Sequence, residues 1–225
     1  YLDNAESFEA LTRLGFDQSA MIENDGAQAY VLQSESDCVV VCRGTERTEW
    51  NDVRASLDFF TVPAATRGRV HRGFDREVDD LWPTIEPELA ATTKRLWFTG
   101  HSLGGAMAMI CALRCRAEYR EVQVEELYTF GSPRVGTDRY VRSGELTHIR
   151  WVNNNDIVAR VPPPFFGYRH AGELVYLDRN GRVAALNARQ RAEDRWQGLK
   201  ATWGRNAISD HAIAAYVRLI DDARA

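Results

Sequence analysis

Several features that mark large classes of protein are missing from this sequence. No apolar run approaches the length that a membrane-spanning helix needs. Acidic residues (32) outnumber basic residues (28), so the chain lacks the basic excess of a nucleic-acid-binding protein. No internal repeat or low-complexity segment occurs, and the hydrophobic and charged fractions, 44% and 27%, are ordinary for a globular chain. We therefore expect a folded protein with no transmembrane segment and no nucleic-acid partner.

Cysteine is scarce, and its four copies form two pairs. Cys38 and Cys42 belong to a predicted strand, where this spacing puts them about 13 Å apart, too far to form a disulfide or share an ion. Cys111 and Cys115 fall four residues apart on a predicted helix, but no histidine or carboxylate cluster accompanies them. The sequence therefore predicts buried free thiols and no metal site, which favours a reducing compartment.

The N-terminal segment lacks the apolar stretch and small-residue cleavage site of a signal peptide. A cytoplasmic location is therefore slightly favoured. The numbering begins at Tyr1, so secretion stays open if an upstream segment is missing.

With 225 residues, the chain has the length of one domain with a full core, and we expect a single domain over residues 1–225. Short apolar strands alternate with helical segments, which predicts an α/β fold with a mostly parallel central sheet and helices on both faces. The predicted strands cover residues 37–44, 94–100, 124–133, 147–156 and the start of 171–186, and the predicted helices cover residues 104–120, 187–203 and 211–220.

Three further segments have recognisable patterns. Residues 2–16 have apolar side chains at helical spacing, which predicts an opening helix. Asn24, Asp25 and Gly26 form a turn between two short predicted strands. Residues 75–92 form a second helical segment, which we expect to be adjusted or broken around its two prolines.

The segment Gly100-His101-Ser102-Leu103-Gly104 separates a predicted strand from a predicted helix. In one interpretation it is an ordinary tight turn that happens to contain serine. In the other, a strand-to-helix G-x-S-x-G turn presents its serine as a nucleophile, with glycines where the backbone approaches itself closely. The strand before and the helix after favour the second interpretation, so Ser102 is the predicted nucleophile.

Five motifs together resemble the class 3 lipases, the fungal-type branch of the α/β-hydrolase superfamily. They are "VVVCRGTE", "VHRGF", "FTGHSLGGAMA", "YTFGSPRVG" and "VNNNDIVARVPP", in the same order as in that family. The resemblance implies the α/β-hydrolase fold with a lid segment, a Ser-Asp-His triad, hydrolysis of carboxylic esters of lipids, and no cofactor.

A serine nucleophile needs a histidine base, and this fold places the acid and then the histidine after the serine. That order leaves His148, His170 and His211 as bases. The acid is predicted to be Asp156, which follows a strand and matches the acid position of the family. Asp138 is the second candidate for the acid, and Asp210 is set aside because it is the sequence neighbour of His211. The base is predicted to be His211, because "DHAIAAY" resembles the closing segment of the family.

Two backbone N–H donors must stabilise the oxyanion that forms on the substrate. One is expected from Leu103, the residue after the nucleophile. The resemblance places the other at Thr45, in the loop after the strand 37–44.

The resemblance also implies a lid, here at approximately residues 46–60. Trp50 and Val53 could form its inward apolar stripe and contact substrate, although an amphipathic helix packed on the core would show the same pattern. The segment carries more charge than we expect of a lid that acts on bulk triglyceride. A smaller or more polar ester is therefore also considered as the substrate. Phe165, Phe166 and Tyr168, after three prolines, could line an acyl pocket, although aromatic residues so placed are more often core or rim residues.

The predicted function is that of a serine carboxylic-ester hydrolase acting on triacylglycerol or partial glycerides, with no cofactor and no metal. Its partners would be the ester substrate and, transiently, a lipid interface contacted by the lid. A phospholipase A1 or aryl esterase would use the same residues. A silent lipase-like binding or signalling scaffold and a serine peptidase are the alternatives from other classes.

Overall fold

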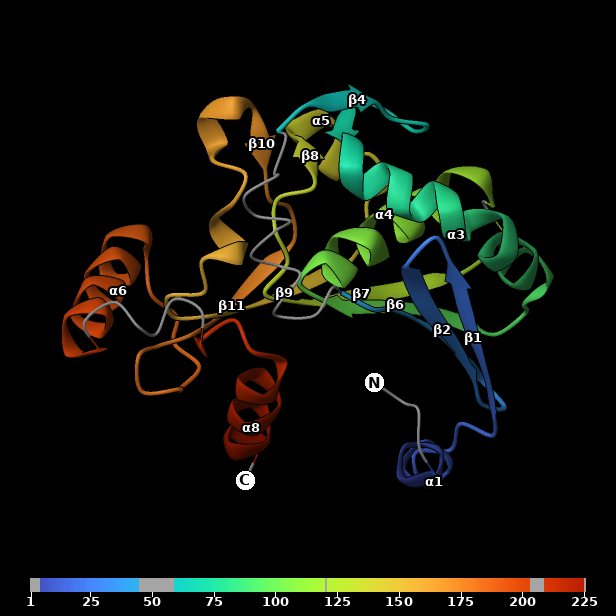
Figure 1. Cartoon of the computed structure of the whole chain (residues 1–225), viewed down its shortest axis with the longest axis horizontal. Coiled ribbons are helices and arrows are strands. Elements are labelled where there is room, and N and C mark those ends of the chain that lie inside the picture. Colours follow the sequence, from blue (N-terminus) through green and yellow to red (C-terminus); the bar gives the residue numbers. More distant parts are fainter. Residues whose placement is uncertain (1–4, 45–58, 120, 203–208, 225) are drawn as a thin grey trace.

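The computed structural model describes residues 5–44, 59–119, 121–202 and 209–224. Two sheets with helices on both faces of the larger one make up an α/β architecture (Figure 1). The predicted lid residues Trp50 and Val53 lie outside the described residues, as does Thr45. The prediction of a single domain over residues 1–225 stays a prediction.

The larger sheet has seven strands, of which the last five in spatial order are parallel. The hairpin of the first two strands pairs Asn24 with Ala27 across Asp25 and Gly26, both at positive φ, which confirms the predicted turn. In spatial order the strands are β1 (Gln18–Asn24), β2 (Ala27–Gln33), β3 (Asp37–Cys42), β6 (Arg95–His101), β7 (Val124–Phe130), β9 (His148–Asn153) and β11 (Glu173–Leu177).

A smaller antiparallel sheet lies beyond the helices that cover one face of the larger sheet (Figure 1). Its four strands have only two or three residues each. In spatial order they are β10 (Tyr168–Arg169), β8 (Gly136–Thr137), β5 (Arg69–His71) and β4 (Thr61–Pro63).

Helices cover both faces of the seven-stranded sheet, as the alternating pattern predicted. In Figure 1, α3 and α4 lie on one face and α8 on the other. The described helices are α1 (Ala5–Arg13), α3 (Arg72–Ala91), α4 (Leu103–Glu118), α5 (Asp138–Val141), α6 (Ala188–Thr202) and α8 (Ile213–Arg224), with 3₁₀ turns η1 (Val158–Arg160) and η2 (Pro164–Phe166).

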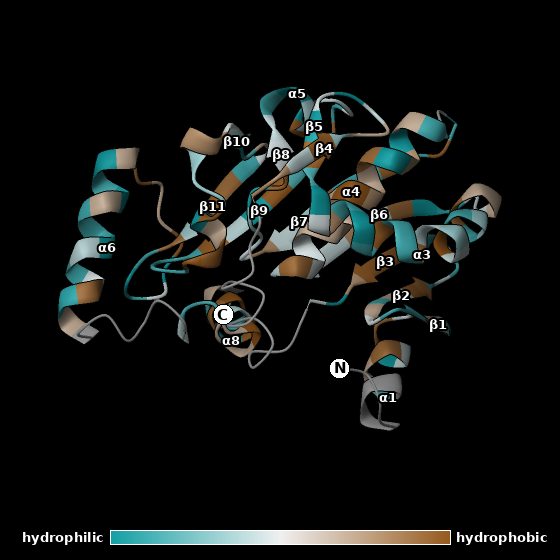
Figure 2. Ribbon diagram, turned by 45° about the horizontal axis from the view of Figure 1, so that its top comes forward, coloured by the Kyte–Doolittle hydropathy of each residue, from teal (hydrophilic) through white to brown (hydrophobic). Residues whose placement is uncertain are grey.

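The core lies between the sheet and α4. This helix is buried from Leu103 to Cys115, because α3 covers it on the side away from the sheet, and only its last turn is exposed. Figure 2 shows the hydrophobic colouring of β3, which packs beneath α4. Burying a helix on all sides holds its first residue, next to Ser102, in a rigid position.

The expected break in the second helical segment does not occur. Helix α3 runs without interruption from Arg72 to Ala91 and contains both Pro83 and Pro87. The two prolines lie on its exposed side, while five apolar side chains at helical spacing anchor the other side in the core: Phe74, Val78, Leu81, Ile85 and Leu89. Packing of that buried face outweighs the loss of two backbone hydrogen bonds.

All four cysteines are free and buried, as predicted. Cys42 and Cys111, from β3 and α4, are hydrogen-bonded, and this contact together with burial raises the pKa of the Cys42 thiol. Burial likewise raises the pKa of Cys38 to about 11. Such thiols stay protonated at neutral pH and act as small core residues.

Candidate active site

Ser102 occupies the sharp turn between β6 and α4. Its backbone has φ 59° and ψ −130°, a conformation that L-residues rarely adopt. The Ser102 N–H donates to the carbonyl of Phe130, at the end of the neighbouring strand β7, at 3.0 Å. The sheet and the helix therefore over-determine the strained turn, which is the geometry expected of a nucleophile turn.

Gly100 and Gly104 make this turn possible. A Cβ at Gly104 would run into the backbone oxygen of Cys42 in β3, and a Cβ at Gly100 would run into the backbone of Gly104. Both positions require hydrogen in place of a side chain, because backbone atoms cannot move aside. The two glycines of the motif thus have a steric role that the sequence pattern predicted.

His211 lies in the turn that precedes α8, so it does not start the last helix as expected. Its Nε2 lies 2.8 Å from Ser102 Oγ, and its Nδ1 lies 2.9 Å from Asp156 Oδ2. An ionised carboxylate can only accept, so Nδ1 carries the proton and Nε2 accepts from the Ser102 hydroxyl. The three side chains form one chain of hydrogen bonds.

Asp156 follows β9, and its side chain is completely buried. Besides His211, the carboxylate accepts from the Val158 N–H at 2.8 Å and from the Tyr216 hydroxyl at 2.7 Å. Tyr216, in α8, also accepts from the Asn153 N–H at 2.9 Å. These donors compensate the buried charge and orient the carboxylate towards His211.

His101 also contacts His211. Its Nε2 donates to the His211 carbonyl at 2.6 Å, and the two rings stack with their centroids 4.6 Å apart. Burial lowers the pKa of His101 to about 4, so the ring is neutral at pH 7. Sequence reasoning excluded His101 as the base and assigned no role to Tyr216. The signal for Tyr216 was its place five residues after His211 in "DHAIAAY".

The other candidates lie apart from this group. His148 is buried, and its Nε2 lies 2.8 Å from Thr129 Oγ1, whereas His170 is bonded to the Ala159 carbonyl. Asp138 pairs with Arg142 on the surface of the protein. Asp210 accepts from the Asn155 N–H, and burial raises its pKa to about 6.

The predicted oxyanion donors can be compared only in part. Leu103 is the first residue of α4, so its N–H has no carbonyl partner within the helix and lies directly beside Ser102. Thr45 lies outside the described residues.

Phe165 and Phe166 do not lie in an enclosed pocket. Phe165 is 82% exposed and Phe166 50% exposed, and their ring centroids are 4.6 Å apart. Phe59, at the end of the predicted lid, packs against Phe166 at 5.1 Å, and the adjacent Phe60 is 70% exposed. The rings of Phe59, Phe165 and Phe166 thus form an aromatic cluster, and any contact of these rings with substrate stays a prediction.

Within the described residues, no group of three or more histidine, cysteine or acidic side chains is placed to hold a metal ion. The same part of the chain contains no helix that is both long enough and apolar enough to cross a membrane.

Comparison with known proteins gives lipases among the relatives. A lipase of Rhizomucor miehei is 35% identical over 179 residues, which cover 72% of this chain and 47% of the relative. The secreted mono- and diacylglycerol lipase 1 of Fusarium solani is 36% identical over 117 residues, covering 48% and 34%. The chain thus spans less than half the length of either relative.

Solved structures have the same fold. A lipase from Rhizopus microsporus var. chinensis superposes with a TM-score of 0.63 and 26% identity, covering 79% of this chain and 66% of that one. A triacylglycerol lipase whose catalytic centre is a serine protease triad gives a TM-score of 0.60 and 30% identity, with coverages of 72% and 66%. The fold is therefore that of the α/β-hydrolases, as predicted. The family described as lipase (class 3) matches residues 39–166, more than half of the sequence, and the chain belongs to that family.

Proposed function

We propose that this protein is a serine carboxylic-ester hydrolase that acts on lipid esters. The observation that carries the proposal is the chain of hydrogen bonds from Ser102 through His211 to Asp156. The activity of the relatives, which include a mono- and diacylglycerol lipase and a triacylglycerol lipase, supports the choice of substrate class.

In the first half of the reaction, Ser102 Oγ attacks the ester carbonyl carbon while its proton passes to His211 Nε2. The carbonyl electrons move onto the oxygen, which becomes an oxyanion. Asp156 stabilises the imidazolium that forms and keeps Nδ1 protonated. Collapse of the intermediate breaks the ester C–O bond, and His211 returns the proton to the departing alcohol.

In the second half, water attacks the acyl carbon and gives its proton to His211. The second intermediate collapses by breaking the bond between the acyl carbon and Ser102 Oγ, and His211 returns the proton to that oxygen. The carboxylic acid leaves, so one water is consumed for each ester cleaved. The Leu103 N–H stabilises both oxyanions, and Thr45 is the proposed second donor. Removing one such donor costs about 3–4 kcal/mol of transition-state stabilisation in comparable sites.

The aromatic cluster of Phe59, Phe165 and Phe166, together with the exposed Phe60 next to it in the sequence, supports contact with a lipid surface. Aromatic rings that are exposed together lose contact with water when they enter an apolar interface. We propose that this cluster acts with the predicted lid at 46–60, including Trp50 and Val53, when the enzyme meets aggregated lipid. A smaller ester would not require that contact.

A silent scaffold would have lost a triad member or the oxyanion loop. The sequence retains Ser102, Asp156 and His211, and it retains Thr45 of that loop. A phospholipase A1 or an aryl esterase would use the same three residues and differ only in the pocket.

The first test is hydrolysis of p-nitrophenyl esters of increasing acyl length by the wild type and by Ser102→Ala. We expect the wild type to be active and the variant to lose at least about 10³-fold in rate, because removing the nucleophile leaves only binding and oxyanion stabilisation. Equal activity of the two proteins would exclude Ser102 as nucleophile. If both were inactive on every ester and on emulsified glycerides, the scaffold alternative would replace the proposal.

A further inference from the structure

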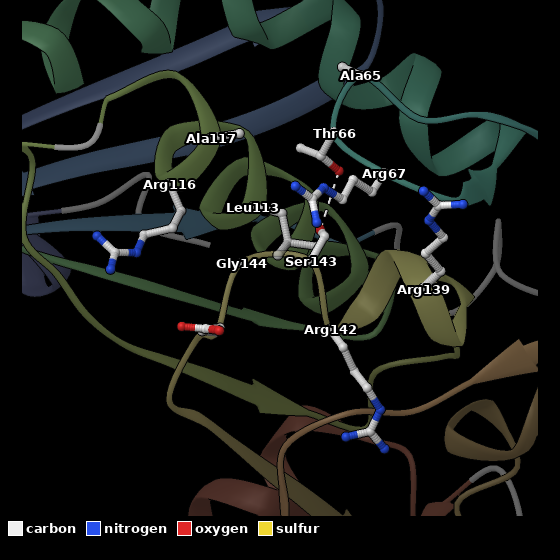
Figure 3. A pocket seen from close by; sticks show the side chains of 11 residues that line it. Ala65, Thr66, Arg67, Leu113, Arg116, Ala117, Arg139, Arg142, Ser143 and Gly144 are labelled. Carbon is white, nitrogen blue, oxygen red and sulfur yellow. Dashed lines mark hydrogen bonds between the residues drawn. The ribbon is translucent and has the colours of Figure 1, made fainter.

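A cavity lies away from Ser102, between three separate elements. Its walls come from the loop joining β4 and β5, the last turns of α4, and α5 with the segment that follows it (Figure 3). Its volume is about 730 Å³, within the range of sites that take an organic small molecule. Nothing in the proposed hydrolysis uses it.

Four arginines line this cavity, although the chain as a whole has a net charge of −4. Arg142 is paired with Asp138 at 2.9 Å. Arg67, Arg116 and Arg139 form no ion pair with any residue in the described part of the chain. These three side chains leave positive charge at the cavity that a bound anion can neutralise.

The three unpaired arginines come from different parts of the fold. Arg67 belongs to the β4–β5 loop, Arg116 to α4 and Arg139 to α5, and all three are exposed to solvent. In Figure 3, Arg116 lies on one side of the cavity, Arg139 on the other, and Arg67 between them. The planar guanidinium group with its fork of donors is the side chain best suited to phosphate oxygens.

The rest of the lining fits a carbon skeleton that carries several anionic groups. Thr66 Oγ1 and Ser143 Oγ are 3.3 Å apart and link the β4–β5 loop to the segment after α5, as the dashed line in Figure 3 shows. Both hydroxyls can also donate to a ligand oxygen. Ala117 of α4 adds a small apolar surface, whereas Leu113 is only 1% exposed. One acidic side chain, Glu145, lines the cavity, which leaves an excess of positive charge.

We propose that this cavity, which we call the arginine pocket, binds an organic molecule that carries two or more phosphate groups. Three arginines without ion pairs match a ligand with several negative charges. The volume exceeds what one phosphate ion fills and leaves room for the ligand's carbon atoms.

The bound molecule is not the ester being cleaved. Helix α4 begins directly after Ser102 and carries Arg116 near its other end, about 20 Å away at 1.5 Å per residue. The arginine pocket is thus an effector or anchoring site, and its ligand can be either soluble or the headgroup of a membrane lipid.

Isothermal titration with inositol hexakisphosphate tests the proposal in about 150 mM salt, where the Debye length is about 8 Å. We expect saturable binding by the wild type, and affinity at least tenfold weaker in Arg67→Ser/Arg139→Ser. The matched control is Arg182→Ser/Arg189→Ser, which changes the net charge equally at two exposed arginines that do not line the pocket. Equal weakening by both pairs, or no binding by the wild type, would overturn the proposal.

Sedimentation with vesicles distinguishes the two sources of the ligand. Phosphatidylcholine vesicles that contain phosphatidylinositol 4,5-bisphosphate are compared with vesicles of equal charge made with phosphatidylserine. If the protein prefers the phosphatidylinositol 4,5-bisphosphate vesicles and this preference requires Arg67 and Arg139, the ligand is a lipid headgroup. If the protein binds inositol hexakisphosphate but shows no such preference among vesicles, the ligand is soluble. Thermal unfolding and p-nitrophenyl ester hydrolysis are measured on the same variants. The rate of hydrolysis should stay within twofold of the wild type, and the melting temperature within a few degrees. Ser102→Ala should bind the ligand as the wild type does, because the arginine pocket does not contain Ser102. Failure of the proposed hydrolysis and failure of this proposal are therefore distinguishable.

Discussion

The imidazole of His101 holds His211 from two directions, by donating to its backbone carbonyl at 2.6 Å and by stacking on its ring. The residue next to the nucleophile therefore supports the proposed base, across 110 positions of sequence. His101 itself contacts neither the substrate position nor Asp156 through any hydrogen bond in the described part of the chain, so its role is to position His211.

Replacing His101 with phenylalanine should keep the stacking and remove the hydrogen bond. We expect kcat to fall about tenfold, the equivalent of about 1.4 kcal/mol, with KM nearly unchanged, because His101 does not touch substrate. The measurement is steady-state hydrolysis of p-nitrophenyl butyrate. His101→Gln, which retains an N–H donor, should recover part of the loss. A fall in KM or thermal stability alone, with kcat intact, would contradict the positioning role.

Replacing Tyr216 with phenylalanine should weaken the proposed triad without removing any member. The substitution deletes the hydroxyl that donates to Asp156 at 2.7 Å and leaves the buried Asn153 N–H without its acceptor. We expect a loss of about 1–3 kcal/mol in the free energy of unfolding and a lower kcat. Urea unfolding and kinetics on one preparation measure both. Asp156→Asn provides the comparison, with a loss of about 10⁴-fold in kcat because the histidine tautomer is wrong.

Buried neutral histidines should make the protein sensitive to mild acid. Burial lowers the pKa of His101 to about 4 and that of His148 to about 3, both below the value of 6.5 in an unfolded chain. The unfolded state then binds more protons, so the free energy of unfolding is highest above pH 6.5 and declines as the pH falls towards 4. Each pKa unit corresponds to about 1.4 kcal/mol.

Asp210 contributes to the pH dependence of the free energy of unfolding in the opposite direction. Burial raises its pKa to about 6, so the stability it contributes is lost as the pH rises through that value. Two histidines outweigh it, so the net slope stays positive. Urea unfolding between pH 5 and 8 measures the slope, and His148→Gln should flatten it. A free energy of unfolding that increases as the pH falls over this range would rule out neutral buried histidines.

The aromatic cluster should matter for aggregated substrate only. Phe165→Ser/Phe166→Ser removes two exposed rings and leaves the hydrogen bonds of Ser102, His211 and Asp156 in place. We expect several-fold lower activity on emulsified triacylglycerol and unchanged activity on dissolved p-nitrophenyl acetate. The ratio of the two rates, measured in one preparation, gives the result. Phe60→Ser should act in the same direction, and an equal loss on both substrates would instead indicate an acyl-binding role.

The local pattern of the sequence carried much of the fold. Alternation of apolar strands with helices gave the parallel sheet, and glycines at fixed offsets around Ser102 gave the turn, because both depend on sterics over a few residues. The same local reasoning failed for Pro83 and Pro87, where burial of five side chains across the helix decides whether it continues.

Only the tertiary structure decided which distant groups meet. Ser102 and His211 are 109 positions apart, and no local pattern could show that the Tyr216 hydroxyl would reach Asp156 or that His101 would stack on His211. Likewise Arg67, Arg116 and Arg139 look like scattered surface charges in the sequence, and the packing of α4 and α5 brings them to one cavity. Steric effects on the local backbone depend on neighbouring residues, whereas contacts across the fold depend on how the whole core packs.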